Sequence, residues 1–148
     1  MRNYLHTFMT GLEAFCRNHS MVGDCIVVRG ESEIENMVFS ENAVVLMIDS
    51  ANISTEDGNP IYTVRFVAAV VGKGKGGRLG PTVQVEECLF ILSQIQGEAE
   101  RLSNNSAEFG EVDVQSDFDE SSDLTALSTI FEVKFGRGYC DTATLYGQ

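Results

Sequence analysis

The sequence has few of the residues from which hydrolytic, metal and disulfide sites are built. Its 148 residues include no tryptophan, two prolines, two histidines and four cysteines. Both histidines, His6 and His19, lie near the start of the chain, which argues against most hydrolytic sites because these depend on a positioned base. The cysteines form no CxxC pair, so we interpret them as buried thiols in a reducing cytoplasm. They are Cys16, Cys25, Cys88 and Cys140.

Long hydrophobic runs are also absent. The longest, Ala43 to Ile48 and Phe66 to Val71, fall far short of the roughly 20 residues that cross a bilayer. The start of the chain lacks a continuous apolar signal core, so we expect a soluble, non-exported protein without a membrane partner. A chain of this length can bury roughly 70% of its unfolded surface. We therefore expect one domain over residues 1–148 that needs no metal or disulfide to fold.

Positive charge is scarce. The sequence has 22 acidic and 10 basic side chains, which gives a formal charge of −12 at pH 7. Such a charge repels phosphate and argues against a protein that grips duplex DNA over a broad surface. We therefore expect no specific nucleic-acid partner.

What the sequence does contain is a clear helical pattern in two segments. Apolar residues recur at helical spacing and predict amphipathic helices over residues 2–19 and 81–102. Pro81 suits the first turn of the second helix. The first stripe consists of Leu5, Phe8, Met9, Leu12, Phe15 and Cys16, and the second of Val85, Cys88, Leu89, Leu92, Ile95, Ala99 and Leu102.

Strand-forming residues dominate much of the remaining chain. Extended segments are predicted at residues 25–29, 37–39, 43–49 and 61–71, with a turn at 55–60. The 61–71 segment has no glycine or internal proline and is expected to be a central strand. Period-two alternation predicts antiparallel strands at 109–114 and 127–135, joined by a polar connection or frayed strand end at 115–123. No element is assigned to the tail, 139–148.

The order of these elements predicts the fold class. Strand runs interrupted by helices at two points suggest an α+β fold. We expect one mostly antiparallel sheet with two long helices packed on one face.

A glycine-rich basic segment spans residues 72–80. It matches GxGxxG literally, but Arg78 to Pro81 separate it from the helix that would bind pyrophosphate. No acidic residue follows at the end of a next strand about 20 residues on, because that region is still predicted helix. A P-loop is excluded because no Gly-Lys-Ser/Thr occurs. Three of the ten cations, Lys73, Lys75 and Arg78, lie in this segment. We interpret them as a subunit or partner contact that orders against an acidic surface.

An acidic stretch without any cation occupies the last third of the chain. Its residues are Glu108, Glu111, Asp113, Asp117, Asp119, Glu120 and Asp123. Residues 117–123 imitate the start of an EF-hand loop, but Ser122 replaces the turn glycine and Ser128 stands where the bidentate glutamate belongs. A solvated surface is the preferred interpretation, and it predicts an acidic lumen or partner surface.

Cys16 and His19 are one helical turn apart, so a zinc half-site or a Cys–His dyad is conceivable. No second ligand pair has matching spacing, and we interpret the two as a core thiol beside a helix-end histidine. Ser20 and Asp24 do not complete a triad, because no nucleophile elbow or oxyanion loop is recognisable. We therefore expect no catalytic, cofactor or metal site, and no enzyme.

The order of elements resembles the tail terminator proteins of tailed bacteriophages. The resemblance rests on the N-terminal amphipathic helix, the run of strands that ends in the apolar segment 61–71, the second long helix, and the closing strand 127–135. It implies a hexameric ring that caps the head-proximal end of the tail tube, stops its polymerisation and joins it to the neck. The implied partners are the tail tube protein and a neck or connector protein.

The resemblance also implies a location and the absence of a catalytic centre. The protein would be assembled in the host cytoplasm and reside at the tail–neck junction of the virion. An acidic lumen would repel DNA phosphates and let the genome pass without binding it. Two alternatives stay open: another phage head–tail joining or tail tube protein, and a small-ligand-binding α+β domain that uses the segment 72–80. A metal-dependent enzyme is the least favoured reading.

Overall fold

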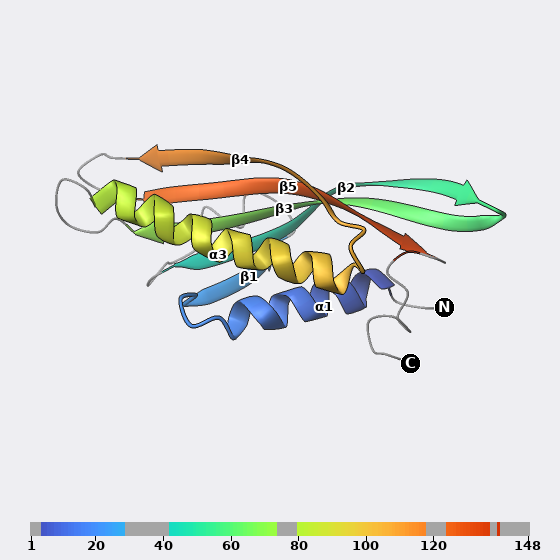
Figure 1. Cartoon of the computed structure of the whole chain (residues 1–148), viewed down its shortest axis with the longest axis horizontal. Helices are drawn as coiled ribbons and strands as arrows, with labels where there is room; N and C mark the ends of the chain where they lie inside the picture. Colours follow the sequence, from blue (N-terminus) through green and yellow to red (C-terminus); the bar gives the residue numbers. More distant parts are fainter. Residues whose placement is uncertain (1–3, 29–41, 74–79, 118–123, 137–138, 140–148) are drawn as a thin grey trace.

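The computed structural model describes residues 4–28, 42–73, 80–117, 124–136 and 139. Within these residues, two helices and five strands form one α+β unit, with both helices on the same side of a single sheet (Figure 1). In chain order the elements are α1 (Tyr4–Arg17), β1 (Asp24–Val28), β2 (Ala43–Glu56), β3 (Asn59–Lys73), α3 (Gly80–Leu102), β4 (Glu108–Asp117) and β5 (Leu124–Gly136).

The sheet is mixed, and this corrects the predicted fold class. Its strand order is β1-β2-β3-β5-β4; β1 pairs with β2 in parallel and the other neighbours are antiparallel. The expectation of a mostly antiparallel sheet with two long helices is wrong, since α1 has 14 residues and α3 has 23. Hydrophobic patterns locate strands but do not reveal their direction. Residues 29–41, which connect the parallel pair and contain the predicted strand 37–39, lie outside the described chain.

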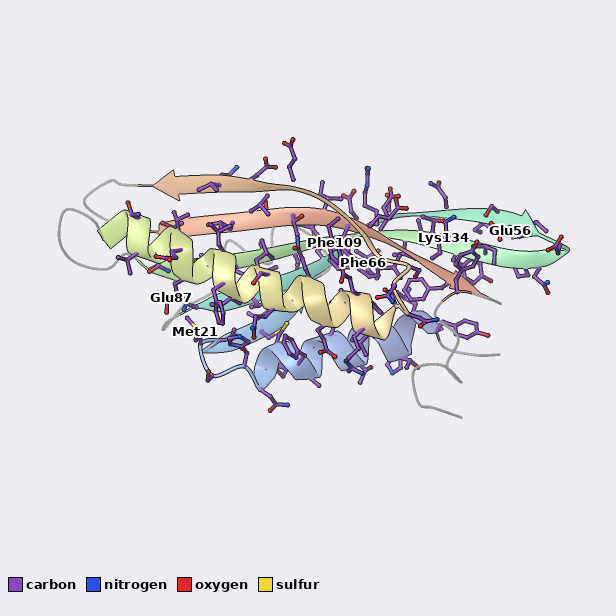
Figure 2. All side chains as sticks on the ribbon, viewed as in Figure 1. Met21, Glu56, Phe66, Glu87, Phe109 and Lys134 are labelled. Atoms are coloured by element: carbon purple, nitrogen blue, oxygen red, sulfur yellow. The ribbon has the colours of Figure 1, made fainter. Side chains whose placement is uncertain are left out.

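The core lies between the helices and one face of the sheet. Strand alternation places Phe66 of β3 and Phe131 and Phe135 of β5 on this face, where all three are buried. Phe8 of α1 packs against them, with ring centroids 5.4 Å from Phe66 and 5.5 Å from Phe135. Phe109 of β4 extends the aromatic cluster, 5.5 Å from Phe131 (Figure 2). Central β3, predicted as such, lies between β2 and β5.

Helix α3 begins one residue before the predicted start and ends at the predicted residue, but its buried side differs from the prediction. Leu89 is 43% exposed, whereas Gln84 and Ile91 are fully buried. A broad apolar stripe does not fix which flanking positions the sheet covers.

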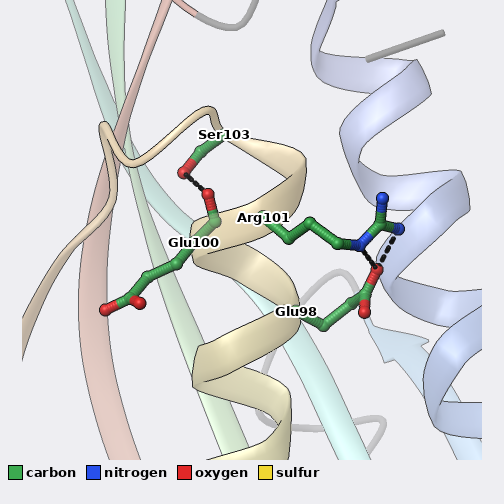
Figure 3. Close-up of polar contacts among 4 residues, drawn as sticks. All are labelled: Glu98, Glu100, Arg101 and Ser103. Carbon is green, nitrogen blue, oxygen red and sulfur yellow. Dashed lines mark hydrogen bonds and ion pairs between the residues drawn. The ribbon is translucent and has the colours of Figure 1, made fainter. Parts of the chain in front are cut away.

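The end of α3 is a Schellman motif. The N–H of Asn105 donates to the carbonyl of Glu100 (2.8 Å) and that of Asn104 to the carbonyl of Arg101 (3.3 Å). Both asparagines have positive φ. Figure 3 shows this last turn, where the guanidinium of Arg101 pairs with Glu98 and the hydroxyl of Ser103 donates to the carbonyl of Glu100 (3.2 Å).

Strand β2 is longer than predicted. The expected end at Asp49 is wrong, because β2 continues past a bulge between Ile48 and Ser50 and pairs with β3 as far as Glu56. Some of the polar residues after the bulge, such as Asn52 and Glu56, are weak strand formers, so their extension depends on the ladder with β3. The hairpin closes through Asp57 (φ 49°) and Gly58 (φ 79°), inside the predicted turn. Two consecutive positive φ values suit an Asp-Gly pair and match the twist of the flanking strands.

Candidate functional site

The outer part of the β2–β3 hairpin, residues 48–62, projects from the body of the molecule; we call it the arm. Figure 1 shows that it extends beyond the ends of both helices. Every residue from Ile48 to Gly58 is exposed. The cross-strand ladder nevertheless continues to the pair formed by Glu56 and Asn59. The arm is therefore a regular hairpin that is open to contact with another molecule.

One face of the arm is apolar. Ile48 lies opposite Phe66, and Ile53 lies opposite Tyr62, so these side chains continue the helix-covered face of the sheet past the helices. Ile53 is 78% exposed, which is high for a large apolar residue. The apolar face of the arm consists of Ile48, Ala51, Ile53 and Tyr62. The strand predicted from the sequence stops at Asp49, so the prediction does not include this apolar face. The alternation of Ala51 and Ile53 before an Asp-Gly turn is the sequence signal that indicates it.

A groove of about 460 Å³ lies at the base of the arm. It separates the first turns of α1 from the apolar face of the arm, and most of its lining is apolar. It is lined by Tyr4, Leu5, His6, Met9, Ile48, Tyr62 and Phe135. A groove of this size and composition can accept a large apolar or aromatic side chain.

The arm carries negative charge only. Asp49, Glu56 and Asp57 are exposed, and the sequence has no lysine or arginine between Ile48 and Val64. Two arms therefore repel one another, and a cationic surface attracts an arm.

The predicted basic contact begins at the other end of the same strand. Lys73 is the last residue of β3, whose first residue is Asn59, next to the tip of the arm. Lys75 and Arg78 lie outside the described residues. The strand thus separates the anionic arm from the start of the cationic segment by its full length, about 50 Å for 15 residues.

Gly72, the first glycine of that segment, has a packing role. A Cβ atom there would lie 1.7 Å from Nε2 of Gln84 and 2.6 Å from Oδ1 of Asn42. Gln84 donates to Asn42 Oδ1 (3.1 Å), and Asn42 in turn donates to the carbonyl of Met21 (3.0 Å). Because the Met21 carbonyl can only accept, Asn42 must direct its NH2 group at it and its Oδ1 atom at the NH2 group of Gln84. The Oε1 atom of Gln84 is therefore a buried acceptor without a partner among the described residues. Close packing accounts for this glycine without a nucleotide.

The predicted acidic surface lies partly on β4. Among the described strands β4 pairs with β5 alone, so Glu108, Glu111 and Asp113 lie along one edge of the sheet, and all three are exposed. Asp117 ends β4, and Asp119, Glu120 and Asp123 lie outside the described residues. Acidic residues and a bulge on an edge strand oppose pairing with further strands.

No lysine or arginine occurs among these acidic residues in the sequence, but cationic side chains of neighbouring strands lie close to them in the structure. Glu108 lies directly opposite Glu132, which pairs with Arg65 of β3 at 3.5 Å. A polar groove of about 180 Å³ adjoins it, and Lys134 lies 5.2 Å from the ring centroid of Tyr139 there. The groove is lined by Thr63, Asn105, Ser106, Glu108, Glu132, Lys134 and Tyr139.

Cys16 and His19 have the surroundings expected of a core thiol and a helix-end histidine. Cys16 and Cys25 are fully buried and interact; a hydrogen bond to Cys25, together with burial, raises the pKa of the Cys16 thiol far above its ordinary range. Nδ1 of His19 accepts from the N–H of Met21 (3.1 Å), and the histidine ring packs edge-on against Phe15 and Phe90. A protonated thiol is a poor nucleophile and a poor metal ligand.

Within the described chain, no group of three or more His, Cys, Asp or Glu side chains is arranged to hold a metal ion. None of the helices that the structure describes is long and apolar enough to cross a membrane. A comparison with models of known protein families finds no match, and a comparison with curated proteins finds no similar sequence. The features that remain for a functional interpretation are the arm, the cationic segment and the acidic edge.

Proposed function

We propose that the protein is a structural virion component similar to the tail terminators of tailed bacteriophages. Copies of the chain assemble into a ring, hexameric in that family, which caps the head-proximal end of the tail tube. The ring stops tube polymerisation and joins the tube to the neck. The role requires no catalytic centre and no cofactor.

The observation that carries the proposal is the opposite charge at the two ends of β3. The arm is anionic, whereas three of the ten cations of the sequence lie in the segment that begins at the other end of β3. Asp117 of β4 lies at that same end of the sheet, because it and Lys73 both pair with Leu124. Complementary surfaces at opposite ends of one molecule favour head-to-tail contact, and head-to-tail contacts close into rings when the rotation between copies permits. In this arrangement Lys73, Lys75 and Arg78 of one copy attract the acidic residues on the arm of the next.

The acidic edge supplies a second element of the proposal. If β4 faces the ring's channel, Glu108, Glu111 and Asp113 repel DNA phosphates and keep the passing genome from binding. Asp117, Asp119, Glu120 and Asp123 would extend the same surface. A ring structure or cross-linking map that places all of these acidic residues on the outer rim contradicts the lumen assignment.

Size-exclusion chromatography with light scattering tests the ring. We expect a discrete oligomer for the natural chain and a shift towards monomer when Lys73, Lys75 and Arg78 are all changed to Ser. The matched control changes Arg17, Arg65 and Lys134 to Ser, which removes the same charge elsewhere and should preserve the oligomer. A monomer at all concentrations, or equal effects of the two triple variants, contradicts the proposal.

A charge exchange sharpens the test. Glu56→Lys with Asp57→Lys should weaken assembly, as should Lys75→Glu with Arg78→Glu. Mixing or combining the two sets should restore it, because each reversed surface then meets its complement. Addition of purified tail tube protein then tests the capping role: the ring should limit tube length, and the monomeric variants should not.

A further inference from the structure

Two cysteine side chains meet in the core, and the proposed ring uses neither of them. Cys16 lies in the last turn of α1, and Cys25 is the second residue of β1. Both are fully buried members of one hydrophobic cluster, and their thiols hydrogen bond to each other. A single buried thiol packs as a small apolar side chain, whereas two thiols in contact can also form a bond with each other.

The short connection between α1 and β1 holds the two cysteines together. The N–H of His19 donates to the carbonyl of Cys16 (3.2 Å), and the N–H of Val22 donates to the carbonyl of His19 (3.1 Å). The N–H of Gly23 then donates to the carbonyl of Asn42 (2.7 Å), just before the start of β2. These bonds turn the chain back at the end of the helix, so β1 begins beside the last turn of α1.

The two thiols differ in reactivity. Cys16 donates the hydrogen bond between them, which raises its pKa, so this thiol keeps its proton. Cys25 accepts the bond, which lowers its pKa below the ordinary value of 9.0 although burial opposes the change. The thiolate is the nucleophile in thiol–disulfide exchange, and a second thiol within reach is needed to complete the reaction. Cys25 is therefore suited to attack first, and Cys16 to resolve the intermediate.

We propose that Cys16 and Cys25 are a redox-active pair, which forms a disulfide between α1 and β1 when the protein meets an oxidising small-molecule disulfide. The Cys25 thiolate attacks one sulfur of the small disulfide, forms a mixed disulfide and releases the first small thiolate. Cys16 then attacks the Cys25 sulfur and releases the second. The protein loses two electrons and two protons, and the small disulfide gains them to become two thiols. The inference does not depend on the proposed ring, because both thiols belong to one copy.

Burial controls access to the pair. Each cysteine is 0% exposed, so a small disulfide reaches Cys25 only when the contact between α1 and β1 opens. Strand β1 is suited to such an opening, since it has five residues and pairs, among the described strands, with β2 alone. The thiols stay reduced in a reducing compartment, whereas an oxidising one allows the disulfide to form during an opening. The bond then ties an edge strand to the helix that covers it.

Equilibration of the full-length chain in glutathione buffers of rising oxidised fraction tests the proposal. Peptide mapping after the free thiols are blocked should find a disulfide between Cys16 and Cys25, which dithiothreitol removes. Cys88→Ala, which removes an equally buried thiol, and Cys140→Ser are the matched controls and should keep this disulfide. Cys16→Ala and Cys25→Ala should form no disulfide within the chain. In the natural chain, a pair that stays reduced at the most oxidising ratio, even in urea just below the unfolding midpoint, overturns the proposal, as does a disulfide from either thiol to Cys88 or Cys140.

Thermal unfolding measures what the bond does to the fold. A disulfide that closes the short loop between residues 16 and 25 should raise the midpoint of the oxidised chain by about 5–10 °C over the reduced chain. Dithiothreitol should reverse the shift, and Cys16→Ala should show no difference between oxidising and reducing buffers. A lower midpoint after oxidation would show that the bond strains α1 against β1, and it would refute a native role for the disulfide.

Discussion

The amide of Gln84 occupies the space into which any side chain at Gly72 would project, with only 1.7 Å between its Nε2 atom and the position of an added Cβ. The same amide donates to Asn42, so it cannot move away without breaking a buried hydrogen bond. The end of β3, the start of β2 and the first turns of α3 are joined at this point. Gly72, the first residue of the cationic segment, is therefore held in place by close packing.

Gly72→Ala should therefore lower the free energy of unfolding by about 1–3 kcal/mol, the usual cost of overpacking a core. Urea denaturation measures the loss. Adding Gln84→Ala should recover part of it by making room, which a double-mutant cycle detects as a coupling between the two positions. If Gly72→Ala is neutral, the Gln84–Asn42 contact does not constrain this region.

Glu108 and Glu132 face each other across β4 and β5, and the repulsion between them should be measurable. Glu108→Gln is expected to raise the free energy of unfolding by about 0.2–1 kcal/mol, as relief of directly opposed like charges does. The gain should shrink in high salt, because both side chains are solvated. Glu111→Gln is the control: Glu111 lies within the register shift of β4 and has no paired position on β5, so an equal gain there would indicate a general charge effect.

The buried thiol of Cys16 should make the protein less stable in alkali. In the unfolded chain this thiol loses its proton near its ordinary pKa of 9.0, whereas hydrogen bonding to Cys25 and burial raise its pKa in the folded state. The same hydrogen bond lowers the pKa of Cys25, which offsets the effect below about pH 9. Above about pH 9 the unfolded chain has lost both thiol protons while the folded state still holds that of Cys16, so the free energy of unfolding falls as the pH rises further. Urea denaturation between pH 7 and pH 10 measures the fall, and Cys16→Val should reduce it. An unchanged pH dependence in that variant would assign the effect to other groups.

The Schellman motif at the end of α3 depends on a residue that tolerates positive φ. Asn104 has φ 53°, so Asn104→Val should lower the free energy of unfolding by about 1–2 kcal/mol, the cost of the left-handed region for an ordinary side chain. Asn104→Gly should be neutral or stabilising, since glycine favours this position. Thermal unfolding of the two variants separates the effect of backbone conformation from that of the lost amide. Similar losses in both would show that the amide matters instead.

The sequence was informative for α1 and β5, each of which buries one face. The helical spacing of Phe8, Leu12 and Cys16 and the alternation of Phe131, Val133 and Phe135 correspond to the observed core. It was uninformative where pairing decides the structure. The parallel direction of β1 depends on contacts with β2 and leaves no local signal. The extension of β2 to Glu56 depends on its ladder with β3, and the alternation of Ala51 and Ile53 before the Asp-Gly turn is its only local sign.

The candidate surfaces divide in a similar way. Charged residues can be recognised in the sequence directly. The acidic residues of β4 could therefore be predicted to be exposed, and Lys73 to lie near the end of a strand. The apolar face of the arm had only a weak sequence signal, the alternation of Ala51 and Ile53, and its exposure follows from the pairing of Ile53 with Tyr62 beyond the reach of both helices. Likewise, the sequence does not indicate that Gln84 is buried, because its burial follows from the packing of Gly72 and Asn42 against it.

The contact between Phe8 and Phe135 has a consequence for the order of events during synthesis. Phe8 belongs to the first helix and Phe135 to the last strand, and their rings meet in the centre of the core. Phe8 also packs on Phe66 of β3, but its contact with Phe135 forms only after almost all of the described chain has left the ribosome. Until then the apolar side of α1 is only partly covered, and a chain that stops before β5 lacks Leu127, Phe131, Val133 and Phe135 of the core. A chain without its final strand therefore cannot complete the core on which the β2–β3 hairpin is built.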